Sequence, residues 1–189
     1  MAERNPALIS NLLEMRCEEK PDMVGLVFEN GGAYPDEKLT YREILENSMK
    51  MAAGLAELGF AKGDKLALVL RNVPEIVYAL AAASFLGLVI VPIDPRSKGD
   101  KLAYQLQDST ARGVISSADL MPEVEAAATS TPDLKVVIMA LKPDSDPALA
   151  DKYRTTNAML AGPAVTELRG RIDDPALPLE IIYTSGVTG

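Results

Sequence analysis

The chain has 189 residues, of which 48% are apolar and 24% are charged, so its composition is that of a globular protein and excludes general disorder. Acidic residues outnumber basic residues by 27 to 19, and the net charge of −8 argues against broad nucleic-acid binding, which needs basic surface. Histidine is absent from the sequence, which excludes histidine-based acid–base catalysis, Ser-His-Asp triads and most zinc sites.

The single cysteine, Cys17, excludes an internal disulfide and indicates a reducing compartment. It falls in a predicted helix, where packing is the better interpretation, because a catalytic cysteine usually needs a histidine partner. The N-terminus shows no basic segment followed by an apolar core, so we expect no signal peptide and a cytoplasmic location. Residues 76–93 are strongly apolar, but they contain Gly and Pro and divide into a helix and a strand more naturally than they form a membrane span.

The first predicted elements are an amphipathic helix within residues 5–22, a strand over 23–30 and a long helix that begins at Thr40. Thr40 and Glu43 have the spacing of a capping box, in which each side chain binds the other residue's backbone amide. The apolar residues of this helix share one face, at Ile44, Met51, Leu55 and Leu58.

From residue 64 onward, strands and helices alternate. The predicted strands cover residues 64–70, 88–93, 112–117 and 134–141, and the predicted helices cover 74–87, 100–109 and 118–129. Ser97 and Asp100 indicate a second capping pair before the middle helix of these three. The spacing suits right-handed βαβ crossovers, so we predict an α/β fold: an open, mostly parallel sheet with flanking helices.

The sequence divides into a βα core over residues 1–141, an irregular excursion over 142–178, and a strand with a loop over 179–189. The excursion is rich in Pro and Asp, and we expect one helix within it near residues 148–160. A linker between two halves of the domain is the alternative, although the strand after the excursion indicates that the chain returns to the sheet.

The last residues, "IIYTSGVTG" from Ile181 to Gly189, change abruptly from an apolar strand to hydroxyl groups and glycines. Successive amides in such a loop can point into one concavity, where hydroxyls add further donors, and together they can bind a phosphate. Gly186 and Gly189 would permit the backbone to approach a ligand closely or to adopt positive φ. A polar hairpin turn is an equally good interpretation of the spacing alone, and the sequence contains no Walker motif.

Several ordered motifs resemble the adenylate-forming superfamily of acyl-CoA synthetases, peptide-synthetase adenylation domains and luciferases. "YTSGVTG" resembles the phosphate-binding signature of that superfamily, and "LTYREI" at residues 39–44 resembles an early helix-start motif. Residues 62–96 and "LAYQLQDSTARGVI" at 102–115 are similar to its strand–helix–strand run. The resemblance covers residues 8–140 and 174–189 and is closest to the acyl-CoA synthetases. Val187 departs from the usual Thr or Ser and removes one hydroxyl.

The resemblance implies an ATP-dependent, AMP-forming ligase of fatty acid metabolism that converts a carboxylic acid to an acyl-adenylate and then to a coenzyme A thioester. It implies ATP, Mg²⁺ and coenzyme A as cofactors and substrates. The acidic charge and the division of the apolar stretch add the expectation of no nucleic acid and no membrane span. The residues it assigns to nucleotide binding are Thr184, Ser185, Gly186, Val187, Thr188 and Gly189. It places no catalytic residue and no metal ligand in this sequence, because the family's catalytic segments follow the phosphate loop. We therefore expect a truncated N-terminal AMP-binding domain that is inactive alone.

The sequence also permits two alternative functions. The chain resembles amino-acid adenylation domains at "PIDP", and the thiol acceptor would then be a carrier protein. A non-catalytic scaffold or interaction module is the other alternative.

Further polar residues have structural interpretations. Asp94 and Arg96 follow a predicted strand, where turns favour Asp and Pro, so we expect a structural role. We expect Tyr183 to anchor the end of a strand. Surface or packing positions are expected for three helix residues, Tyr104, Gln105 and Gln107.

Overall fold

The computed structural model describes residues 4–32, 34–142, 144–146, 148–164 and 170–184. These residues form two compact units, each assembled from three separate stretches of the chain. The first unit contains residues 1–62, 72–88 and 158–177, and the second contains 63–71, 89–157 and 178–189.

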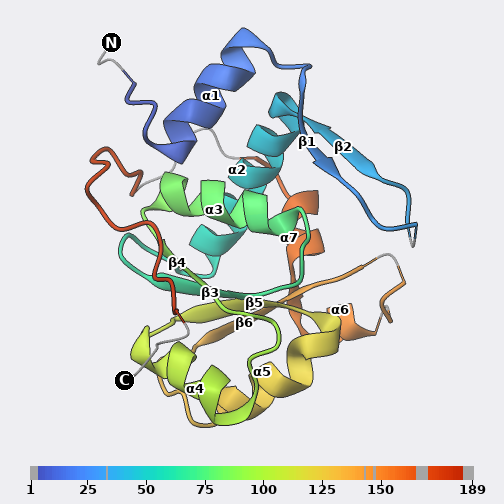
Figure 1. Cartoon of the computed structure of the whole chain (residues 1–189), viewed down its shortest axis with the longest axis vertical. Coiled ribbons are helices and arrows are strands. Elements are labelled where there is room, and N and C mark those ends of the chain that lie inside the picture. The colour runs from blue at the N-terminus through green and yellow to red at the C-terminus, as the bar shows by residue number, and fades with distance from the viewer. Residues whose placement is uncertain (1–3, 33, 143, 147, 165–169, 185–189) are drawn as a thin grey trace. The chain divides into compact units, whose positions relative to one another are not determined.

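The first unit is mainly helical (Figure 1). Its elements are α1 (Ile9–Glu19), β1 (Val24–Phe28), β2 (Glu37–Thr40), α2 (Tyr41–Glu57), α3 (Glu75–Leu86) and most of α7 (Thr156–Ala161). Leu13 of α1, Ile44 of α2 and Ala81 of α3 meet in a small buried cluster, so one apolar stripe from each helix builds the core of this unit.

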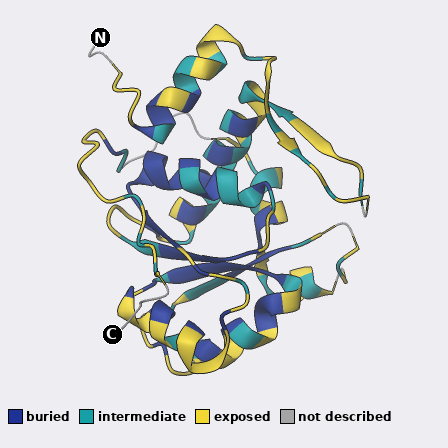
Figure 2. Cartoon of the chain, viewed as in Figure 1, coloured by how far each residue is buried: buried dark blue, intermediate teal, exposed yellow. Residues whose placement is uncertain are grey.

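The start of α2 follows the sequence prediction. The backbone amide of Glu43 donates to the Thr40 side chain over 3.3 Å, and the Thr40 amide donates to the Glu43 carboxylate over 2.8 Å. The capping box is therefore confirmed. The antiparallel β1–β2 pair was not predicted, because β2 is short, polar and partly exposed, as Figure 2 shows.

The second unit is built on a five-stranded sheet with the strand order β4-β3-β5-β6-β7, in which every neighbouring pair is parallel. Its strands are β3 (Lys65–Val69), β4 (Val89–Pro92), β5 (Gly113–Ser117), β6 (Val136–Ala140) and β7 (Arg154–Thr155). Its helices are α4 (Gly99–Asp108), the 3₁₀ turn η1 (Ala118–Leu120), α5 (Met121–Ala128) and α6 (Leu149–Lys152). The predicted α/β fold with a parallel sheet is confirmed.

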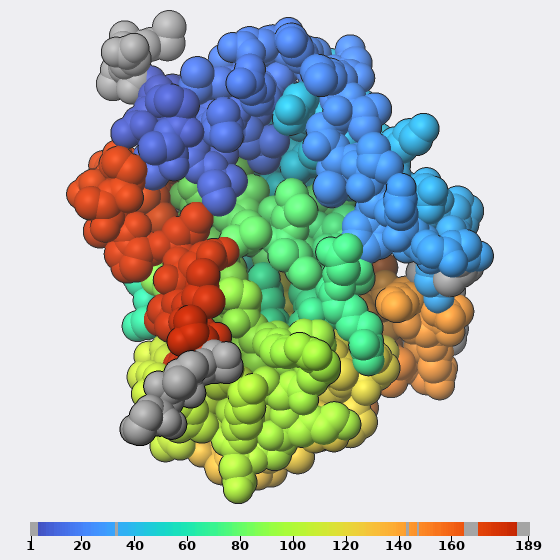
Figure 3. All heavy atoms as spheres, viewed as in Figure 1, coloured from blue at the N-terminus to red at the C-terminus, as the bar shows by residue number. Residues whose placement is uncertain are grey.

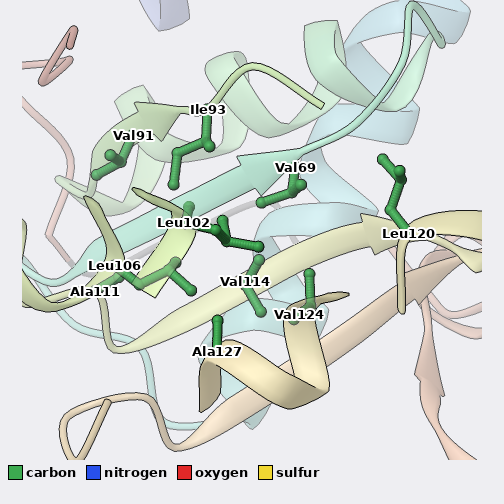
Figure 4. Close-up of a cluster of buried hydrophobic side chains, with 11 residues drawn as sticks. Val69, Val91, Ile93, Leu102, Leu106, Ala111, Val114, Leu120, Val124 and Ala127 are labelled. Atoms are coloured by element: carbon green, nitrogen blue, oxygen red, sulfur yellow. The ribbon is translucent and has the colours of Figure 1, made fainter. Parts of the chain in front are cut away.

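Helices α4 and α5 cover one face of this sheet. Leu102 and Leu106 of α4 and Val124 of α5 are fully buried against Val114 of β5 and further residues of β3 and β4 (Figure 4). Near-continuous apolar strands are typical of parallel sheets, whose strands are covered rather than exposed to water.

Two local predictions are wrong. Helix α4 begins at Gly99 with Lys98 as its N-cap, and the Ser97 hydroxyl is buried without a hydrogen-bond partner, so Ser97 and Asp100 are not a capping pair. The single helix expected near residues 148–160 is instead two short helices separated by β7, which extends the sheet beyond β6. Within the described residues, no helix combines the length and the apolar character needed to cross a membrane.

Candidate phosphate-binding site

The segment that leads to the glycine-rich end of the chain adds to the edge of the parallel sheet. The Ile90 amide donates to the Leu179 carbonyl over 2.8 Å, and the Ile181 amide donates to the Ile90 carbonyl over 2.9 Å. These two bonds form a parallel bridge between Ile90 and Glu180 on the side of β4 that faces away from β3. The segment therefore runs in the same direction as the other strands.

The pairing is short because of Pro92. In a parallel ladder, the amide two residues after Ile90 would donate to the Ile181 carbonyl, but that position is a proline and has no N–H. No backbone bond of residues 182–184 to β4 is found in the described part of the chain. The Ile181 carbonyl therefore lacks its ladder donor, and β4 does not engage the amides of residues 182–184 in that part of the chain.

Tyr183 holds the segment of residues 182–184, called the released segment below, to helix α4. Its hydroxyl donates to the Asp108 carboxylate over 2.7 Å and lies 3.3 Å from the Gln105 carbonyl oxygen. Its ring meets the Tyr104 ring edge-on, with centroids 6.3 Å apart, and packs with Ile181 against the buried α4–α5 cluster. Burial, reinforced by the Asp108 carboxylate, raises the pKa of Tyr183 to about 12, so the phenol remains a donor at neutral pH. The contact agrees with the anchoring role expected for Tyr183.

Thr184 is the one predicted nucleotide-binding residue within the described part of the chain, and it is exposed directly after Tyr183. The other predicted residues, Ser185, Gly186, Val187, Thr188 and Gly189, lie outside the described residues. Because Thr184 follows a strand-like segment, the loop begins at the carboxyl edge of the sheet. Ligand sites of open parallel sheets lie outside this edge.

The charged residues after β4 bind each other. The Arg96 amide and guanidinium both donate to the Asp94 carboxylate over 2.8 Å, and these hydrogen bonds lower the pKa of Asp94 to about 2. The Ser97 amide also donates to the Asp94 carbonyl over 2.8 Å, so the two residues close the turn after the strand. This geometry fits the structural role that we expected for them.

The three polar residues singled out for surface or packing positions lie on helix α4. Tyr104 and Gln107 are exposed, whereas Gln105 is buried and its side-chain oxygen has no partner. Asp108 was not singled out from the sequence, because its partner Tyr183 lies 75 residues further along the chain. No local spacing could have identified that pair.

Comparisons with known proteins agree with this arrangement. The sequence matches the family described as AMP-binding enzyme over residues 13–189. It is 30% identical over 180 residues to the 2-succinylbenzoate–CoA ligase of Bacillus velezensis, covering 95% of this chain and 31% of that protein. The chain thus spans about a third of the length of the relatives it matches.

Two solved structures show the same fold. The anthranilate CoA ligase AuaEII, in complex with anthranoyl-AMP, superposes with a TM-score of 0.80 at 20% identity over 96% of this chain and 33% of the other. The Mycobacterium tuberculosis fatty acyl CoA synthetase superposes with a TM-score of 0.77 at 25% identity over 97% of this chain and 34% of the other.

A parallel α/β sheet, with Tyr183 and Thr184 following a bridge to its edge strand β4, is an architecture in which ligands bind outside the carboxyl ends of the strands. The family match is more specific and covers nearly the whole chain. The chain belongs to the AMP-binding enzyme family.

Proposed function

We propose that the complete gene product activates a carboxylic acid with ATP and transfers the acyl group to coenzyme A. In the first step, a carboxylate oxygen attacks the α-phosphorus of ATP, forming the acyl-adenylate and releasing pyrophosphate. In the second step, the thiol sulfur attacks the acyl carbon, and AMP leaves with the bonding electron pair while the thiol proton is released. The observation that carries this proposal is the Thr184–Gly189 sequence, which follows a segment bridged in parallel to Ile90 of β4, in a chain of the AMP-binding enzyme family.

The residues of this chain fit the phosphate part of such a substrate. Thr184 supplies an exposed hydroxyl, and the amides of residues 182–184 have no backbone partner in the described part of the chain. We assign β- and γ-phosphate contacts to Thr184, Ser185, Gly186, Val187, Thr188 and Gly189, with the amides acting as donors at every one of these positions. Their task is to hold the polyphosphate while negative charge moves onto pyrophosphate, which is electrostatic work.

Magnesium has a weaker basis in this chain. Among the residues that the structure describes, no group of three or more Asp, Glu or Cys side chains has the arrangement of a metal site. Magnesium would reduce the charge of the triphosphate when bound to ATP, but we assign it no ligand here and derive no step through it.

The acid substrate differs among the relatives. The relatives named above are a 2-succinylbenzoate, an anthranilate and a fatty acyl ligase, so their acids range from aromatic to aliphatic. We propose an acid of fatty acid metabolism, as the sequence resemblance implies, and a cytoplasmic enzyme.

The proposal is tested with ATP–pyrophosphate exchange on the complete gene product. A panel of aliphatic, aromatic and amino acids is supplied with ATP and magnesium, and coenzyme A is then added to detect AMP and the thioester. Acid-dependent exchange followed by thioester formation supports the proposal. Release of ADP and phosphate, or exchange with amino acids alone, would contradict it.

A further inference from the structure

The end of the sheet-edge segment is held by a side chain where the backbone ladder has stopped. The last ladder bond runs from the Ile181 amide to the Ile90 carbonyl, and Pro92 removes the next donor. Beyond Ile181, the next fixed point in the described chain is the Tyr183 hydroxyl on Asp108. The Tyr183 side chain, through its packed ring and its hydroxyl bond to Asp108, thus sets where Thr184 begins.

The acceptor of this bond, Asp108, belongs to a helix that is packed firmly on the sheet. Asp108 is the last residue of α4, whose side chains Leu102 and Leu106 are fully buried in the core of the second unit. Buried, close-packed side chains hold a helix in one position relative to its sheet. A bond to the end of α4 therefore transfers the rigidity of the core to the released segment.

We propose that the Tyr183–Asp108 hydrogen bond positions Thr184 for nucleotide binding. Tyr183 is a positioning residue, since its hydroxyl is engaged by Asp108 and the Gln105 carbonyl. The proposal rests on the function proposed above, in which residues 184–189 contact phosphate. It adds that a residue outside those contacts sets the affinity for ATP and the rate of adenylation.

Tyr183→Phe removes one oxygen atom and keeps the ring that packs on Tyr104 and the core. The expected result is about a tenfold loss of kcat/KM for ATP, the size of one hydrogen bond to a charged group converted to a rate. The KM values for the carboxylic acid and for coenzyme A should stay unchanged. Amide hydrogen exchange of the peptide covering Leu179–Thr184 should become faster in the nucleotide-free protein, while exchange in β5 and β6 stays the same.

Tyr104→Phe is the matched control, because it removes the same atom from the exposed partner ring 6.3 Å away. It should leave both the ATP kinetics and the local exchange at wild-type values. Asp108→Asn is the second variant. It retains an acceptor oxygen with less charge, so its loss of kcat/KM for ATP should be smaller than that of Asp108→Ala. The double variant Tyr183→Phe/Asp108→Ala should be no worse than Asp108→Ala alone, as expected when both changes remove one bond.

The outcomes separate this proposal from the proposed function. A wild-type protein without ATP–pyrophosphate exchange would overturn the proposed function and this proposal together. An active wild-type protein whose Tyr183→Phe variant matches Tyr104→Phe in ATP kcat/KM and in local exchange would overturn this proposal alone. Equal loss for ATP, acid and coenzyme A would show a general structural defect and would also overturn it.

Discussion

The pKa of a single residue can depend on its environment in the fold more than on its neighbours in the sequence. Glu75 begins α3, where burial raises the pKa of its carboxyl group and the nearby Glu37 carboxylate raises it further. An acidic residue at the first turn of a helix usually gains from the helix dipole, but here the loss of water has the larger effect.

Glu75→Gln should therefore stabilise the protein at pH 7. A folded-state pKa above the unfolded value of 4.5 means that the Glu75 contribution to stability is fully present below pH 4.5 and is lost as the pH rises through the folded pKa. The amide stays neutral throughout, so the gain in melting temperature at pH 7 should disappear near pH 4. Thermal unfolding followed by circular dichroism at both pH values checks this, with the exposed Glu29→Gln as control. A gain that persists at pH 4 would rule out desolvation as its cause.

Gly186 should matter more to adenylation than Val187, although Gly186 has no side chain and Val187 has a branched one. In the proposed loop, a Cβ at residue 186 would lie where the backbone approaches phosphate, and loss of one anion donor costs about 10²–10³-fold in kcat. Gly186→Ala should show a loss of this order in ATP–pyrophosphate exchange, whereas Val187→Thr should change the rate by less than about threefold, because the amide remains. The reverse ranking would mean that side-chain hydroxyls dominate the site.

At the scale of elements, the strands of the central sheet were predictable, and two short strands were not. Strands β3, β4 and β6 have the near-continuous apolar pattern of a covered parallel sheet, whereas β5 has only Val114 and Ile115 as apolar side chains; each was expected close to its observed place. By contrast, β2 and β7 are short and depend on a neighbouring strand for their conformation. The Ser97–Asp100 prediction failed because a capping spacing occurs by chance in polar segments, and packing buries Ser97 instead.

In the candidate site, too, local features were predictable from the sequence and long-range contacts were not. Its glycine- and hydroxyl-rich motif is local and was visible in the sequence, whereas the strand expected before it is a single parallel bridge between Ile90 and Glu180. The Tyr183–Asp108 bond was not visible, since it joins residues 75 positions apart. Side-chain pairs between elements depend on the register and packing of the finished sheet, which no short pattern encodes.

The end of α3 offers a test of close backbone packing. Gly87 has φ of +71°, and a Cβ there would collide with the Gly170 carbonyl oxygen and approach the Lys62 side chain. Gly87→Ala should cost roughly 2–4 kcal/mol, from about 1–2 kcal/mol for the left-handed conformation and the rest from overpacking. Gly31→Ala has a similar φ of +59° with open space around it, so it should show only the conformational part. Chemical denaturation of both variants separates the two contributions, and equal losses would contradict the collision.

At the scale of the whole chain, both units are assembled from stretches that are far apart in sequence. In the first unit, the segment around residue 171 lies against the N-terminal helix, as the space-filling view shows (Figure 3). The Arg171 guanidinium donates to the Glu14 carboxylate over 2.8 and 2.7 Å and also to the Asn11 side chain, and it stacks over the Phe85 ring. The pair joins residues separated by 157 positions, so native order at one end of this unit depends on the other.

Arg171→Ala should destabilise the first unit by about 1–2 kcal/mol, because hydrogen bonds to charged groups contribute about 1.5–3 kcal/mol and partial exposure of the pair reduces that figure. Arg171→Lys keeps the charge but loses the planar fork, so it should recover only part of the loss. Most of the effect should appear as faster unfolding, since a contact that closes so long a loop forms late in folding. Denaturation and unfolding kinetics followed by circular dichroism, in a double-mutant cycle with Glu14→Gln, measure the coupling directly. Purely additive losses, or slower folding at an unchanged unfolding rate, would show that this long-range contact does not fasten the two ends of the unit.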